Sequence, residues 1–166
     1  MPRPAARSIG PVKRGALAIL AGLALIGCGD DDDAGAPSAC LGDREAYLAA
    51  LRSVPDEVRL DGTTPISECI VEGQGGGELA QVGEGLVAAA TELNRRARED
   101  PDGKATLQLG YLVGAVQEAA STTGGIHQDL VIRLDSAARF TGGERPFPVS
   151  FERAFGAGYE AGQRSG

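Results

Sequence analysis

Apolar residues recur at helical spacing along most of the chain after residue 78. Leu79, Val82, Leu86, Ala89 and Leu93 follow one another at steps of three and four, which predicts a helix over about 78–98. The same spacing predicts helices at about 43–53, 105–121, 126–140 and 151–162. We find no convincing hairpin and no internal repeat. The chain is therefore expected to be all-α, a small bundle of four to five helices.

Proline and glycine signals separate these helices. Residues before a proline are pushed out of the helical region, so Val54-Pro55 should end the first helix. Asp100-Pro101-Asp102-Gly103 is a strong turn signal, and the next helix should run back antiparallel. Residues 58–72 are ambiguous, because Thr64-Pro65 resembles a helix start whereas Cys69-Ile70-Val71 could be extended.

Glycines spaced four apart lie inside two of the predicted helices, Gly110 with Gly114 and Gly158 with Gly162. Glycine inside a helix costs about 1 kcal/mol relative to alanine. Such pairs let two helix backbones approach closely, as they do between membrane helices. We interpret them as close helix packing, with a narrow groove for a ligand or partner helix as the alternative.

Aromatic residues are concentrated near the C-terminus. All four phenylalanines lie between Phe140 and Phe155, and Phe151, Phe155 and Tyr159 recur at intervals of four. Because one aromatic side chain can bury about 150–250 Å², the C-terminal segment is expected to supply much of the core.

Besides Cys28, which is described below, the chain has two cysteines, Cys40 and Cys69. In an oxidising compartment an even pair predicts a disulfide near the N-terminus of the bundle. Two buried free thiols are the alternative. A metal site is less well supported, because no nearby residues complete a ligand set and His127 is the only histidine.

The first residues have the pattern of an export signal. Residues 1–14 carry Arg3, Arg7, Lys13 and Arg14 and no acidic residue, and Ala16 to Ile26 is uncharged. A basic stretch followed by an apolar run of this length is typical of a secretory signal peptide, and the run is too short to span a bilayer.

The apolar run ends in Leu25-Ile26-Gly27-Cys28, which resembles the lipobox of bacterial lipoproteins. The resemblance implies cleavage after Gly27 and acylation of Cys28. Two or three acyl chains anchor a protein stably, because each buried methylene contributes about 0.8 kcal/mol. The expected location is the cell membrane, with the protein lipid-anchored on the extracytoplasmic side.

Three segments follow from this division: a signal peptide at 1–27, an acidic flexible tether at 28–38 and one helical domain at 39–166. The chain has 16 basic and 23 acidic residues, and the leader holds four of the basic ones. Residues 28–166 therefore carry 12 basic and 23 acidic residues, which gives a net charge of −11. So acidic a domain is not expected to bind nucleic acid or to be attracted by anionic lipid headgroups.

Motifs that would carry chemistry are weak. Gly83 to Ala88 matches the form of a dinucleotide-binding loop but lies in a helical pattern with no strand before it. His127, the one side chain suited to proton transfer near neutral pH, is expected to be exposed in the first turn of a helix. No catalytic residue, cofactor or metal site is predicted.

Function is therefore expected to be that of a membrane-anchored binding or structural module without catalysis, with an unknown envelope protein as partner. One alternative is a carrier with an apolar cavity between its helices for a small ligand. The other is an enzyme that uses His127.

Overall fold

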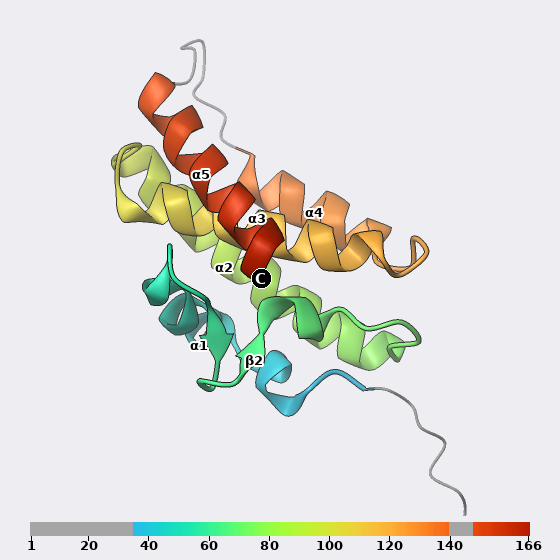
Figure 1. The fold of residues 1–166 in the computed structure, drawn as a ribbon. Coiled ribbons are helices and arrows are strands. Elements are labelled where there is room, and N and C mark those ends of the chain that lie inside the picture. Colours follow the sequence, from blue (N-terminus) through green and yellow to red (C-terminus); the bar gives the residue numbers. More distant parts are fainter. Residues whose placement is uncertain (1–34, 140–147) are drawn as a thin grey trace, which may run out of the picture. The chain divides into compact units, whose positions relative to one another are not determined.

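A computed structural model describes residues 35–139 and 148–166 (Figure 1). Cys28 and the lipobox, most of the expected tether, and the two phenylalanines Phe140 and Phe147 lie outside the described residues.

The described residues confirm the helical class (Figure 1). Five α-helices occur, α1 Arg44–Ala50, α2 Gly76–Glu99, α3 Lys104–Ser121, α4 Gln128–Ala138 and α5 Val149–Ser165. Three short 3₁₀ helices, η1 Ser38–Leu41, η2 Leu51–Ser53 and η3 Ile66–Cys69, complete the N-terminal half. Asp43 begins α1 by accepting a hydrogen bond from the Ala46 amide, and η2 ends just before Val54-Pro55 as expected.

A small hairpin lies between η2 and η3, so the prediction of no hairpin is wrong. Strands β1 Arg59–Leu60 and β2 Thr64–Pro65 pair antiparallel, with Leu60 opposite Thr64. Asp61 and Gly62 have φ values of 51° and 83°, the left-handed conformation that Asp-Gly tolerates in a turn. The Asp61 carboxylate closes the turn by accepting from the amides of Thr63 and Thr64. Thr64-Pro65 is thus a strand, and η3 begins directly after it at Ile66 with Pro65 as its N-cap.

Helix α3 is the centre of the bundle. It runs antiparallel to α2, which precedes it in the sequence, and to α4, which follows it (Figure 1). Helix α5 crosses it. Leu109, Leu112 and Val116 are buried and belong to one hydrophobic core with side chains of α2, α4 and the N-terminal half. The Tyr111 hydroxyl donates to the carbonyl of Ser165 at the end of α5 and accepts from the Val58 amide. One side chain thus joins α3, α5 and the segment leading into β1.

The contact between α3 and α5 is made by backbone. A Cβ atom at Gly110 or Gly114 would overlap the carbonyl oxygen of Phe155 or Tyr159 on α5. The relation is reciprocal, because a Cβ at Gly158 or Gly162 would overlap carbonyl oxygens of α3. The prediction of close helix packing is confirmed, and the backbones leave no groove between these glycines.

The expectation about the phenylalanines is only partly met. Phe151, Phe155 and Tyr159 do stack, with ring centroids 5.9 and 6.4 Å apart. Among them, however, only Phe151 is buried, and the other two are half-exposed along the edge of α5. The largest fully buried side chains are instead tyrosines and leucines of the other elements, led by Tyr47 and Tyr111. The glycines of α3 and α5 determine how these two helices pack more than the aromatic rings of α5 do.

The substitution Gly110→Ala is expected to force α3 and α5 apart, because the new methyl group has no room beside the Phe155 carbonyl. The free energy of unfolding should fall by about 1–3 kcal/mol in urea denaturation. Gly156→Ala is the matched control in α5, since no atom of the described part of the chain lies within 4 Å of a Cβ built there. That variant should be stabilised by up to about 1 kcal/mol. Equal changes in the free energy of unfolding in the two variants would show that stability does not depend on the close approach of α3 and α5.

Candidate functional site

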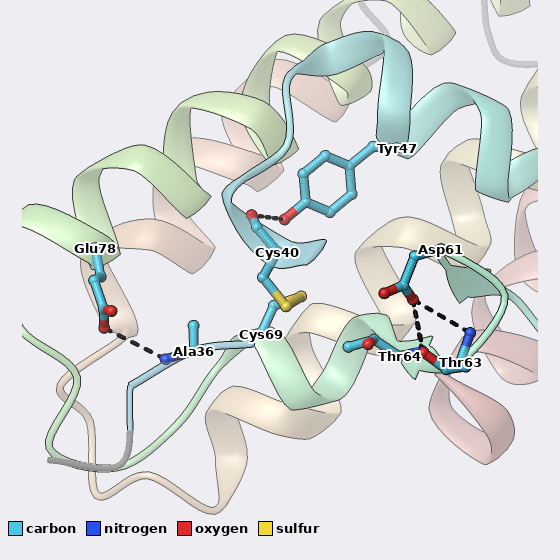
Figure 2. Close-up of a disulfide and its surroundings, with 8 residues drawn as sticks. All are labelled: Ala36, Cys40, Tyr47, Asp61, Thr63, Thr64, Cys69 and Glu78. Atoms are coloured by element: carbon cyan, nitrogen blue, oxygen red, sulfur yellow. Dashed lines mark hydrogen bonds between the residues drawn. A yellow bond between two sulfur atoms is a disulfide. The ribbon is translucent and has the colours of Figure 1, made fainter. Parts of the chain in front are cut away.

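The predicted disulfide is present and lies at the N-terminal corner of the described chain (Figure 2). Cys40 in η1 and Cys69 in η3 are joined with 5.3 Å between their Cα atoms, and both are fully buried. The hydroxyl of buried Tyr47 donates to the Cys40 carbonyl over 2.7 Å (Figure 2). Burial raises the pKa of Tyr47, so the hydroxyl keeps its proton and remains a donor.

Ordered packing begins before residue 39, the expected start of the domain. Ala36 is buried, and its amide donates to the Glu78 carboxylate near the start of α2 over 3.4 Å (Figure 2). Gln81, one turn further along α2, donates to the Leu41 carbonyl. Residues 35–38 therefore pack against the domain instead of extending the tether.

His127 is buried, so the prediction of an exposed histidine is wrong. Its side chain has no exposed surface and precedes the first turn of α4. Nδ1 lies 2.7 Å from the Thr123 hydroxyl, and Nε2 lies 3.3 Å from Oε1 of Gln74. Gln74 is also buried, and its Nε2 has no hydrogen-bond partner among residues 35–139 and 148–166. The histidine thus joins the loop before α2 to the connection between α3 and α4.

Burial lowers the pKa of His127, so the neutral ring with a single N–H is favoured at neutral pH. The Thr123 hydroxyl already donates to the Ala120 carbonyl. Nδ1–H can then donate to Thr123, which leaves Nε2 as an acceptor. Turning the Gln74 amide by 180° places its NH₂ group against Nε2 and gives this buried donor a partner. The cluster is a hydrogen-bonded link between two loops with no solvent-exposed histidine edge.

Sequence reasoning missed the burial of His127 because its partners are remote. Gln74 is 53 residues away in sequence, and nothing in the local pattern brings it near. The dinucleotide-like stretch, by contrast, behaves as expected and lies inside α2. A Cβ at Gly85 would meet the Tyr47 ring, and one at Gly83 would meet Leu130. Because these glycines have no side chains, Tyr47 and Leu130 can pack directly against the backbone of α2.

A hollow that the sequence did not predict lies between α1, α2 and α3, with a volume of about 260 Å³. Three arginines, Arg44, Arg52 and Arg96, line it. The signal was present in the sequence, since Arg44, Leu48 and Arg52 recur at steps of four. That spacing alone, however, predicts only a solvent-exposed helix face, because it does not show that α2 and α3 pack beside it.

Comparisons with known proteins give no match: no family model, no curated protein and no solved structure is similar to this chain. Across residues 35–139 and 148–166, no helix combines the length and apolar character needed to cross a membrane. In the same ranges, no group of three or more His, Cys, Asp or Glu side chains could hold a metal ion.

Stability is expected to fall as the pH drops below the ordinary pKa of histidine, 6.5. The unfolded chain then takes up a proton that the buried, neutral His127 does not, so the slope reaches at most about 1.4 kcal/mol per pH unit. The measurement is the free energy of unfolding at about pH 7.5 and 5.5, compared with His127→Gln. At the higher pH the variant should be less stable than the parent protein, but its stability should not fall with pH in the way that His127 causes. Identical slopes in both proteins would mean that His127 titrates freely in the fold.

Proposed function

We propose that the chain is an envelope lipoprotein, anchored by acyl chains on Cys28 and presenting its helical domain on the extracytoplasmic side. The observation that carries the proposal is Leu25-Ile26-Gly27-Cys28 behind a basic and then apolar leader. The disulfide between Cys40 and Cys69 supports it independently, because such bonds persist in exported proteins and are rare in a reducing cytosol.

The distance between anchor and fold limits where the domain can act. Gly35 is the seventh residue after Cys28, and at about 3.3–3.6 Å per residue this stretch spans at most roughly 25 Å. The partner or ligand must therefore come close to the membrane surface. Residues 28–166 carry a net charge of −11, which opposes adsorption to anionic lipid. The lipid on Cys28 then provides the whole attachment.

The molecular role that these features support is a binding or structural module without catalysis. His127, on which the enzyme alternative depends, is buried and bonded to Thr123 and Gln74, so it contacts no substrate in this conformation. The groove between the glycine pairs of α3 and α5 is closed by backbone contact. Neither the carrier nor the enzyme has a specific structural observation in its favour.

Replacement of the acylated cysteine tests this proposal. Cys28→Ser should move the protein from the membrane fraction to the soluble fraction and abolish incorporation of a labelled fatty acid. The released domain should keep its Cys40–Cys69 bond, because that bond is buried within the fold. Thiol labelling after denaturation, with and without prior reduction, measures this.

Cys40→Ser is the matched control, since it removes a cysteine but leaves the lipobox intact. That variant should stay in the membrane fraction even though it loses the disulfide. Full retention of Cys28→Ser in membranes that have been washed with salt would contradict the proposal.

A further inference from the structure

The hollow between α1, α2 and α3 brings cations from three elements together. Arg44 and Arg52 come from α1 and η2, and Arg96 comes from the C-terminal half of α2. Lys104 at the start of α3 adjoins them, because its Nζ donates to the Arg52 carbonyl over 2.6 Å. Gln108, one turn further along α3, is buried in the wall and donates to the Leu51 carbonyl. These two bonds tie α3 to η2 and set the shape of the hollow.

Among the residues that the structure describes, two carboxylates, Glu45 and Glu92, line this hollow. Glu45 pairs with Arg44, and Glu92 accepts hydrogen bonds from Arg96 and from Arg95. The side-chain hydrogen bonds of these two arginines lower the pKa of Glu92 to about 2, so it is always charged at physiological pH. It holds Arg96 at the rim of the hollow.

Two cations of the group keep their charge uncompensated. Neither Arg52 nor Lys104 forms an ion pair with a carboxylate in the described ranges of the chain. Arg44, Arg52 and Arg96 against Glu45 and Glu92 give the lining of the hollow a charge of +1, and the adjoining Lys104 raises the local charge to +2. The chain as a whole has 23 acidic and 16 basic residues, so most other surface is expected to be negative.

We propose that this hollow binds a phosphoryl group in its dianionic form. Two negative charges match the local charge of +2, and the planar guanidinium groups of arginine bind phosphate oxygens through paired N–H donors. The adjoining Lys104 would add a point charge. Glu45 and Glu92 position two of the arginines and keep the net charge low enough to disfavour larger polyanions.

The charge of the domain indicates where the phosphoryl group comes from, an argument that rests on the proposed lipid anchor. Residues 28–166 carry a net charge of −11, which opposes adsorption to anionic lipid. The charge therefore favours a phosphorylated molecule outside the anchoring bilayer over a lipid headgroup of that bilayer.

Titration of the purified full chain in detergent with inorganic phosphate tests the site. Backbone amide NMR signals of residues 44–52, 92–96 and 104–108 should shift together and saturate, and acetate at equal ionic strength should have little effect. The double variant Arg52→Gln/Lys104→Gln should bind on the order of tenfold or more weakly, because it loses two charged donors. Arg164→Gln is the matched control, an exposed arginine of α5 that pairs with Glu160, and should bind as the parent does.

Absence of saturable shifts with phosphate would overturn the proposal, as would equal affinity of the double variant and the Arg164→Gln control. Both surface variants should keep the helical circular dichroism of the parent. This titration does not depend on the lipid, so failure of the proposed anchoring at Cys28 would leave its result unchanged.

A second measurement distinguishes the source of the phosphoryl group. The Cys28→Ser chain is sedimented with phosphatidylcholine vesicles that contain or lack phosphatidic acid, a lipid with a phosphomonoester headgroup. Equal, low sedimentation with both supports a ligand outside the bilayer. Sedimentation that requires phosphatidic acid, and that is lost when Arg52→Gln and Lys104→Gln are introduced into the same chain, would show that the ligand is a lipid headgroup. That result would overturn the inference of a ligand outside the bilayer.

Discussion

The backbone contact between α3 and α5 is the constraint on which most of the fold depends. Four glycines inside helices cost about 1 kcal/mol each in helix propensity, and close approach of the two helices offsets that cost. At the contact, the Cα–H groups of Gly110 and Gly158 face carbonyl oxygens of the other helix, a geometry that adds weak attraction of its own. Because α3 also packs against α2, α4, η2 and η3, the position of α5 is fixed relative to the whole core.

Polar side chains join the remaining elements to this centre at a few points. Tyr111 connects α3 to the end of α5 and to the segment before β1. The Asn94 amide in α2 donates to the carbonyls of Ala137 and Arg139 at the end of α4. The disulfide and the Tyr47 hydroxyl hold the N-terminal corner. This arrangement gives a rigid domain that is suited to presenting a fixed surface such as the hollow lined by Arg52 and Arg96.

Periodicity alone predicted the helices well, because a bundle repeats the same apolar spacing that local sequence displays. The end of α2 and the start of α3 lie within one or two residues of their expected places, since Asp100 to Gly103 forms a turn by local chemistry. Features that depend on remote partners were missed or wrong. The burial of His127 requires Gln74, and the hollow requires α1 and α3 to meet near Arg96. The Asp61-Gly62 turn was a local signal that its very short strands concealed.

Nuclear Overhauser effects across the α3–α5 contact test the central claim most directly. A Cβ at Gly110 would lie 2.9 Å from the Tyr159 amide nitrogen, and one at Gly158 would lie 3.0 Å from that of Tyr111. The α protons of these glycines point in the same directions, so each should give a strong cross-peak to the amide proton of that tyrosine. Absence of both cross-peaks, with side-chain contacts between α3 and α5 in their place, would contradict the account.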